Sequence, residues 1–379
     1  MKKTRFFTAA AALLLTPALA VPAAAAEPAL ASPGAPFRIF PEKAPETVTL
    51  PTGDELKVPP LFWLRTCTQG PTGTVRTLDG DTQRVMLTAS HCVNTISGLP
   101  PIKNEFSVPV NGTYPRIGER TASNDLKPSA IDLSDPMESI RTADWGIMRI
   151  DDNVSATNIS NSRDYNGGSA GEPVALSGIK DYRTLQPGEV SADNFGQPIC
   201  KDGSTTGRSC ATQIGRTRNG VWSWGLNYQQ GDSGGVNFDP RDNSIIGVTS
   251  MTLGPLGKAQ PADRILEDAY GIPDGQVNEH FTLPDSSAPR AEFGITADEE
   301  KQVNQQLDEL NPGFEPPVPR DELRKAVDSA QQDAAGLAQK ASRGEFNPAE
   351  IDRAVSHHSE KIGYWGGAVL GEEIGKRLP

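Results

Sequence analysis

The 379-residue sequence predicts an all-β fold of antiparallel barrels or a sandwich, followed by a small α-helical C-terminal region. Three observations support this fold class. Gly (37 residues) and Pro (32 residues) are abundant, which favours many turns and short strands. From about residue 61 to 275, short apolar runs alternate with turn residues, without long helical patterns between them. After about residue 285 the pattern becomes helical.

The strand prediction is most specific around Asp79-Gly80, a dipeptide that readily adopts the positive φ angles of a tight hairpin turn. Residues 75–78 and 82–87 flank this turn and are expected to pair as antiparallel strands. Further strand candidates, each a short apolar run bounded by turn residues, are 145–150, 172–176, 221–224 and 245–252.

The C-terminal region is expected to contain three helices. Thr296 and Glu299 have the spacing of a capping box at the start of a polar helix that runs to Leu310. Residues 320–342 form a second helical segment, and Pro348 stands in the first turn of a third. Because large apolar residues are few, we expect a helical appendage distinct from the β region, which could dock a cell-envelope or protein partner.

The N-terminal residues 1–26 have the three parts of a secretory signal peptide. A basic start precedes an apolar stretch from 6 to 21, and small residues lead up to Ala26, after which we expect cleavage. Pro17 interrupts the apolar stretch and Pro22 follows its end, so a transmembrane anchor is not expected. Residues 27–60 are rich in Pro and Ala and are interpreted as a linker or short pro-segment. We expect the β domain to span 61–275, and 276–379 to comprise a linker and the helical region.

Charge and cysteine content narrow the function further. A net charge of −12 without a long basic run argues against nucleic acid or an anionic membrane as the main partner. The four cysteines of an exported chain are expected to form disulfides, and four cysteines allow three pairings. Proximity in sequence suggests Cys67–Cys92 and Cys200–Cys210. No CxxC spacing indicates a metal site, and the adjacent His357 and His358 would point in different directions on a helix, so neither a metal nor a cofactor is expected.

Ser233 is the candidate nucleophile because it stands among glycines in the segment 230–235. Such a segment can turn sharply, and a substrate carbonyl can approach it without meeting side chains. The same turn can aim the backbone N–H groups of Gly231 and Ser233 at one point, which is what an oxyanion hole requires.

A base and an acid that could activate this serine occur earlier in the chain. His91 follows a predicted strand and precedes Cys92, which would hold the imidazole in place. Asp144 stands directly before an apolar strand, where a buried carboxylate could accept a hydrogen bond from the histidine. Nearby carboxylates at positions 132, 135 and 151 are alternatives to Asp144, but none has the same placement before a strand.

These blocks resemble a known family. LTASHC (87–92), ADWGIMRI (143–150) and QQGDSGGV (229–236) are similar to the signature blocks of chymotrypsin-like serine proteases. PICKDGSTTGRSC (198–210) resembles the secreted bacterial branch of the streptogrisin and alpha-lytic type. The resemblance covers roughly residues 61–275. It implies two antiparallel six-stranded β-barrels, with His91 and Asp144 in the first and Ser233 in the second, and it implies the two disulfides proposed above.

One departure from the animal enzymes concerns activation. No Ile-Val-Gly-Gly-type start follows a cleavage site, so a new N-terminus beside Asp232 is not expected. In the bacterial branch that the sequence resembles, a basic side chain after the first cysteine of the GSTTG block takes this role. Lys201 stands there, and we therefore expect a buried Asp232–Lys201 ion pair that holds the oxyanion loop.

Specificity is expected to depend on three positions. Asn227 stands six residues before Ser233, where an acidic residue would select Lys or Arg, so a preference for those residues is not expected. The strand containing Ser250 and Thr252 resembles the one that lines the substrate pocket. A β-branched side chain at Thr252 should narrow the pocket and favour small or medium apolar residues.

The sequence therefore predicts a secreted serine endopeptidase that acts on polypeptides. One alternative is a serine esterase of the α/β-hydrolase type, because residues 231–235 also satisfy G-x-S-x-G and His280 could serve as the base. That motif must lead from a strand into a helix, whereas residues 236–243 favour a strand and a turn. A second alternative is a catalytically silent, protease-like binding module, against which the three catalytic residue types argue.

Overall fold

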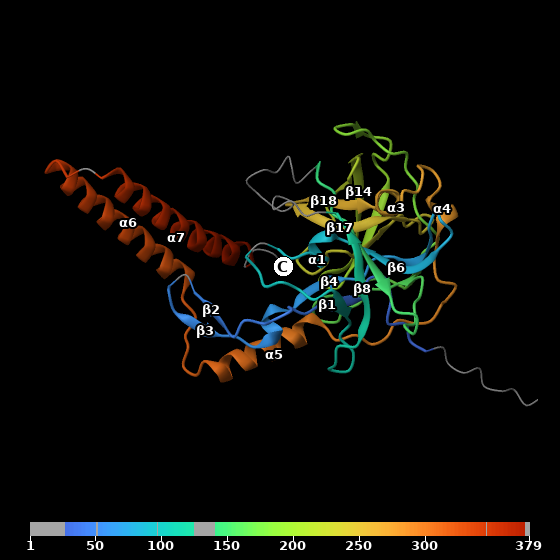
Figure 1. Ribbon diagram of the computed structural model, residues 1–379, viewed down its shortest axis with the longest axis horizontal. Coiled ribbons are helices and arrows are strands. Elements are labelled where there is room, and N and C mark those ends of the chain that lie inside the picture. Colours follow the sequence, from blue (N-terminus) through green and yellow to red (C-terminus); the bar gives the residue numbers. More distant parts are fainter. Residues whose placement is uncertain (1–26, 51, 97, 125–140, 346, 376–379) are drawn as a thin grey trace, which may run out of the picture.

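A computed structural model describes residues 27–50, 52–96, 98–124, 141–345 and 347–375 (Figure 1). The expected signal peptide lies outside these residues. Two antiparallel sheets form the body, and three helices follow it. The prediction of an all-β fold with a C-terminal helical region is confirmed. Among the described residues, no helix combines the length and the apolar character that crossing a membrane requires.

The first sheet has eight strands in the spatial order β19-β5-β6-β9-β8-β7-β1-β4. Its strands, in chain order, are β1 (Pro36–Ile39), β4 (Arg65–Thr68), β5 (Thr72–Arg76), β6 (Thr82–Thr88), β7 (Glu105–Ser107), β8 (Arg116–Ser123), β9 (Gly146–Ile150) and β19 (Phe281–Thr282). The predicted hairpin is present between β5 and β6, and Gly80 supplies the positive φ of +93° in its turn.

The second sheet has seven strands in the order β12-β14-β13-β16-β17-β18-β15, and pairing of β14 with β15 closes six of them into a barrel. Its strands are β12 (Val190–Ser191), β13 (Pro198–Gly203), β14 (Gly207–Thr217), β15 (Gly220–Trp224), β16 (Val236–Phe238), β17 (Ile245–Leu253) and β18 (Leu256–Pro261). The barrel therefore contains the six strands that the family resemblance implies, with β12 added at one edge.

The remaining elements are short strands and helices. The strands are β2 (Thr47–Thr49), β3 (Glu55–Lys57), β10 (Ile159–Ser160) and β11 (Val174–Ala175). The helices are η1 (Pro60–Trp63), α1 (Ser90–Val93), α3 (Ala262–Tyr270), α4 (Val277–His280), α5 (Thr296–Leu310), α6 (Pro319–Ser342) and α7 (Pro348–Gly375). Helices α6 and α7 pack along each other and extend away from the sheets, whereas α5 lies against the body (Figure 1).

The segment 27–60 differs from the linker or pro-segment that its composition suggests. Strand β1 lies inside the first sheet, between β4 and β7, and all four of its residues are buried. Ala29 and Ala31 before it are also fully buried. The sequence did not predict this strand because prolines and a charged residue, Arg38, are unusual in a buried strand. The arginine can be buried only because its ion-pair partner comes from a distant part of the chain. β1 and β19 give the first sheet eight strands instead of six.

The capping box predicted at Thr296 does not form. The helix begins after Ile295, no side chain caps it, and the Thr296 hydroxyl is buried without a hydrogen-bond partner. Glu299, the other half of the expected box, instead forms an ion pair with Arg38 of β1. A tertiary ion pair has therefore replaced the local contact that the spacing predicted.

The two sheets share an apolar core that fixes their relative position. Val85 and Leu87 of the first sheet belong to the same buried cluster as Val236 and Phe238 of the second. Ile265 of α3 belongs to this cluster as well. Because this core joins the two sheets directly, residues at their facing edges hold fixed positions relative to one another.

Candidate active site

The predicted catalytic residues come from both sheets and meet at one cleft. His91 lies on α1, directly after β6, and Asp144 precedes β9 of the same sheet. Ser233 precedes β16 of the second sheet. His91 and Ser233 line a cleft of about 890 Å³, and Asp144 is buried behind His91. The structure thus brings together three residues, the first and last of which lie 142 positions apart in the sequence.

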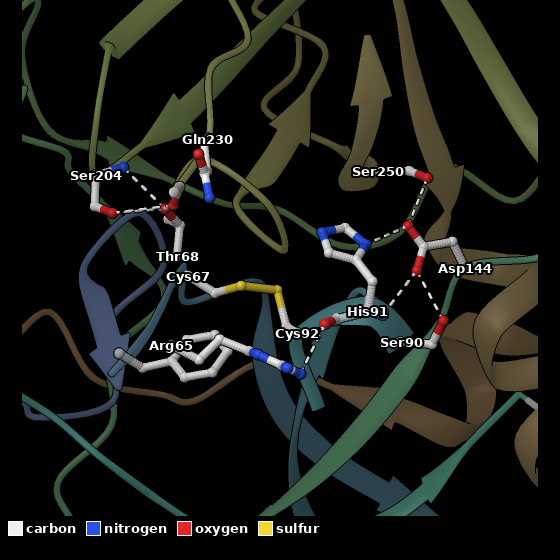
Figure 2. The surroundings of a disulfide bond; sticks show 12 residues. Arg65, Cys67, Thr68, Ser90, His91, Cys92, Asp144, Ser204, Gln230 and Ser250 are labelled. Atoms are coloured by element: carbon white, nitrogen blue, oxygen red, sulfur yellow. Dashed lines mark hydrogen bonds and ion pairs between the residues drawn. A yellow bond between two sulfur atoms is a disulfide. The ribbon is translucent and has the colours of Figure 1, made fainter. Parts of the chain in front are cut away.

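His91 and Asp144 are joined by two contacts. The His91 Nδ1 atom lies 2.9 Å from Asp144 Oδ2, and the backbone N–H of His91 donates to Oδ1 over 3.1 Å. Ser90 Oγ donates to Oδ1 over 2.8 Å, and Ser250 Oγ donates to Oδ2 over 2.7 Å (Figure 2). The carboxylate is held from both sides, so the imidazole is fixed in orientation with Nε2 free to face the cleft.

The same contacts determine the charge of Asp144. Burial alone would raise its pKa, but the charge of His91 and hydrogen bonds from His91, Ser250 and Ser90 outweigh burial and hold the pKa far below its ordinary value. Asp144 is therefore ionised at neutral pH. An ionised carboxylate at this position can stabilise the positive charge that an imidazole gains when it acts as a general base.

Ser233 is partly exposed to the cleft, next to the candidate oxyanion hole. Gly231 has a φ of +97°, and a Cβ there would clash with the Thr205 hydroxyl, so the turn requires glycine. In the described part of the chain, the N–H groups of Gly231 and Ser233 donate to no protein acceptor. Both donors are therefore available to a ligand. No hydrogen bond between Ser233 and His91 is found among the described residues.

Lys201 and Asp232 form an ion pair directly beneath this turn. Lys201 Nζ lies 3.0 Å from Asp232 Oδ2, and both side chains are fully buried. The backbone N–H groups of Thr205, Thr206 and Gln229 also donate to the Asp232 carboxylate, over 2.9 to 3.0 Å. Burial lowers the pKa of Lys201, and the charge of Asp232 opposes this effect. The pair links β13 to the turn that carries Ser233.

Two disulfides brace the site, in the pairs that proximity suggested. Cys67–Cys92 joins β4 to the helix that carries His91, and Cys200–Cys210 joins β13 to β14 (Figure 2 shows the first). Arg65 supports the first bridge, because its guanidinium donates to the carbonyl oxygens of His91 and Asn94.

The predicted substrate-pocket residues separate into two groups. Ser250 and Thr252 line the cleft, but Asn227 does not: it is exposed, and its backbone bonds to Ser209 and Thr206. The next residue, Tyr228, lines the cleft instead. Its ring is buried against Gly257, and its hydroxyl donates to Asn237. Asn227 and Tyr228 lie in the segment between β15 and β16, where the first side chain is exposed and the second is buried.

The alternatives to the predicted residues lie elsewhere. Asp151 bonds to Arg116, and positions 132 and 135 lie outside the described residues. His280 bonds to the carbonyl of Arg76 and does not line the cleft. The chain continues from Ser233 into β16, a strand, so the α/β-hydrolase alternative is wrong.

Three contacts that hold Asp144 were not predicted from the sequence, which assigned Ser250 to the substrate pocket only. Ser90 and Ser250 bind the Asp144 carboxylate, and the Gln260 side chain accepts the backbone N–H of Asp144 over 2.9 Å. Ser90 could have been noticed as the neighbour of His91. The other two come from the second sheet, and no local spacing relates them to Asp144.

Two groups of residues have metal-ligand geometry in the described part of the chain. Cys67, His91 and Cys92 form one group, but its two sulfur atoms are bonded to each other. The other group consists of Asp181, Glu267 and Asp274, whose ligand atoms lie within 4.8 Å of one another. It is remote from the cleft, and Arg264 neutralises part of its charge through Glu267.

Comparison with protein-family models and with curated proteins found no match for this chain. Solved structures do match. Nocardiopsis protease matches with a TM-score of 0.35 and 21% identity, over 55% of this chain and 91% of that one. Thermobifida fusca protease A matches with a TM-score of 0.38 and 19% identity, over 67% of this chain and 99% of that one. Cellulomonas bogoriensis chymotrypsin matches with a TM-score of 0.37 and 19% identity, over 68% of this chain and 99% of that one. The chain, whose sequence blocks resemble those of chymotrypsin-like serine proteases, is thus similar in structure to three bacterial proteases.

Proposed function

We propose that this protein is a secreted serine endopeptidase of the chymotrypsin-like family, which hydrolyses peptide bonds through an acyl-enzyme. The observation that carries the proposal is the arrangement around Ser233. A histidine fixed by an ionised, buried carboxylate shares its cleft, and two backbone N–H groups beside it have no protein acceptor. Nucleophile, base, orienting acid and oxyanion donors are the groups that acyl transfer needs.

In the proposed reaction, Ser233 Oγ attacks the substrate carbonyl carbon while His91 Nε2 takes the hydroxyl proton. The oxygen of the tetrahedral intermediate gains negative charge, and the N–H groups of Gly231 and Ser233 stabilise it. His91 then donates its proton to the leaving amine as the C–N bond breaks. Water, activated by His91, attacks the resulting ester and releases the acid, which restores Ser233. Asp144 stays ionised throughout and stabilises the imidazolium form of His91.

The acyl side of the substrate is proposed to lie along β17, where Ser250 and Thr252 line the cleft. Glu300 on α5 is the one carboxylate among the described lining residues, and the buried Tyr228 ring occupies space beside Gly257. We therefore expect small or medium apolar side chains before the scissile bond, and no preference for Lys or Arg at that position.

A serine-directed phosphonate probe tests the function. The full chain should be labelled once, at Ser233, and should cleave unstructured polypeptides. Ser233→Ala should lose both the label and the cleavage, whereas Ser209→Ala, at a serine outside the cleft, should keep both. Failure of the well-folded protein to take up the probe, or retention of the label in Ser233→Ala, would refute the enzyme assignment and favour a binding module.

Secretion is a separate part of the proposal, because it depends on residues outside the described structure. Two disulfides are consistent with an oxidising compartment. Mass spectrometry of the protein from culture medium should give a chain that begins at Glu27. A start beyond residue 39 would contradict the proposal, because β1 would then be missing from the first sheet.

A further inference from the structure

The first turns of α5 form part of the catalytic cleft. Thr296 and Glu300 line it, together with Tyr165 and Thr205 from the loops of the body. Hydrogen bonds connect these residues in series to the oxyanion turn. The Thr205 hydroxyl donates to the Gln230 carbonyl over 2.9 Å, Tyr165 N–H donates to the Thr205 carbonyl over 2.7 Å, and Ala297 N–H donates to the Tyr165 carbonyl over 3.2 Å. The helix start is therefore positioned relative to Ser233.

Both ends of α5 are anchored, so this cleft wall is rigid. Near its start, Glu299 binds the fully buried Arg38 and accepts a hydrogen bond from the Tyr114 hydroxyl. At its end, the side chain of Asn311 accepts from the backbone N–H of Lys57 and donates to the carbonyl of that residue, over 3.0 and 2.8 Å. A helix held at two points keeps the side chains between them in fixed directions.

Glu299 and Glu300 are adjacent on α5, but their charges have different surroundings. Glu299 is paired with Arg38, whereas Glu300 is exposed, and among the described residues its hydrogen-bond partner is the neutral Tyr165 hydroxyl. That hydrogen bond raises the pKa of Tyr165, so the phenol remains protonated. Arg65, a cation that also lines the cleft, directs its guanidinium to carbonyl oxygens of the His91 segment. At this part of the cleft wall, the Glu300 carboxylate therefore lies at the hydroxyl of the Tyr165 ring.

The position of Glu300 assigns it to one side of the scissile bond. Figure 2 shows Gln230 and Ser250 on opposite sides of His91. Ser250 belongs to β17, along which the acyl side of the substrate is proposed to lie. Gln230 leads through Thr205 and Tyr165 to Glu300, so this end of the cleft faces the residues that follow the scissile bond.

We propose that Glu300 is a specificity residue that selects Lys or Arg on the leaving-group side of the scissile bond. The inference rests on the proposed endopeptidase function. The long aliphatic part of a Lys or Arg side chain can lie against the Tyr165 ring while its charged end meets the carboxylate, and the ring face adds a cation–π attraction. Because this part of the cleft is open to solvent, the preference is modest, about threefold to tenfold, and it weakens with salt.

The test uses quenched fluorescent peptides that share one sequence before the scissile bond. Each carries Arg, Gln or Glu at one of the first four positions after the bond. The ratio kcat/KM is measured at low salt and at about 0.5 M salt, where charges are screened over a short distance. At one position we expect Arg above Gln and Gln above Glu. Glu300→Gln keeps an acceptor for Tyr165 and should bring the Arg-to-Glu ratio close to one, and Glu300→Lys should invert it. Glu309→Gln, which removes a charge from the same helix outside the cleft, should keep the wild-type ratio.

Binding to catalytically silenced protein gives a second measurement. In a Ser233→Ala background, the Arg peptide should bind more tightly than the Glu peptide, and Glu300→Gln should remove the difference. Equal ratios in wild type and Glu300→Gln, with cleavage or binding present, would overturn the proposal and leave the endopeptidase function intact. If the phosphonate probe does not label Ser233 and no peptide is cleaved or bound, the proposed function itself fails and the inference falls with it.

Discussion

Arg38 and Glu299 form an ion pair across 261 positions of the chain, with 2.6 Å between Arg38 Nη2 and Glu299 Oε2. The arginine side chain is fully buried in the first sheet, and its Nε also donates to the same carboxylate. A buried guanidinium is costly unless a carboxylate faces it. The first C-terminal helix is thus part of the body of the protein, and the appendage that the sequence predicts is reduced to α6 and α7.

Glu299→Gln should destabilise the protein, because it leaves a buried arginine without its counter-charge. We expect a loss of about 3 kcal/mol in the free energy of unfolding. Urea unfolding of a Ser233→Ala background, which prevents self-digestion, measures this loss. Asp321→Asn, which breaks the exposed pair with Arg324, should cost less than about 1 kcal/mol. Equal unfolding midpoints for Glu299→Gln and its parent would contradict a role for the pair in docking α5.

Asp144→Asn should abolish most of the activity without unfolding the protein. The amide cannot stabilise the imidazolium form of His91 and favours the wrong tautomer, so kcat should fall by roughly 10⁴-fold. Peptide hydrolysis and the circular dichroism spectrum are measured together. Asp151→Asn, at the nearby carboxylate that binds Arg116, is the matched control and should retain activity. A loss of less than tenfold in Asp144→Asn would mean that another carboxylate orients His91.

Ser250→Ala should lower kcat by about tenfold or less and change KM little, since its hydroxyl donates to Asp144 rather than to substrate. One of the hydrogen bonds that hold the pKa of Asp144 low would be lost. Ser250→Thr, which keeps a hydroxyl, should restore the wild-type kcat. If KM rises while kcat is unchanged, Ser250 contacts substrate instead.

Lys201→Met should damage both stability and turnover, because Asp232 would be left buried without a cation beneath the oxyanion turn. A loss of about 3 kcal/mol or more in the free energy of unfolding is expected, together with a lower kcat. Lys201→Met combined with Asp232→Asn removes both charges and should recover part of the stability. Unchanged activity and melting temperature in Lys201→Met would eliminate the ion pair as the support of this turn.

Asp263 should make stability fall as the pH rises. Burial raises its pKa to about 8, from 3.8, so between these values the folded protein holds a proton that the unfolded chain releases. The contribution is fully present below pH 4 and is lost as the pH passes through 8. As the pH rises from 5 to 8, the unfolding free energy of wild type should therefore fall relative to that of Asp263→Asn, by up to about 1.4 kcal/mol per pH unit.

Urea unfolding at intervals of one pH unit, again in the Ser233→Ala background, measures this difference. Asp242→Asn is the control, because contacts with Ser244 lower the pKa of Asp242 and it stays ionised throughout this range. A difference between Asp263→Asn and wild type that does not change with pH would show that Asp263 is ionised in the folded protein.

The sequence alone determined the features that depend on neighbouring residues. The turn at Gly80, the strands that flank it and the glycine-rich segment around Ser233 follow from local backbone preferences, so they are legible in a short window. The cysteine pairs also follow from proximity, because short loops close most readily. The same kind of local pattern singled out His91, Asp144 and Ser233; in the structure His91 and Ser233 line one cleft, and Asp144 is bonded to His91 behind it.

Tertiary structure decided what depends on contacts between distant segments. β1 is a core strand because Glu299 neutralises Arg38, and the same contact displaces the expected cap at Thr296. Tyr228 is buried and lines the cleft, whereas the neighbouring Asn227 is exposed. Ser250 reaches Asp144 from the other sheet. Burial and charge pairing are properties of the assembled fold, so no local pattern in the sequence records them.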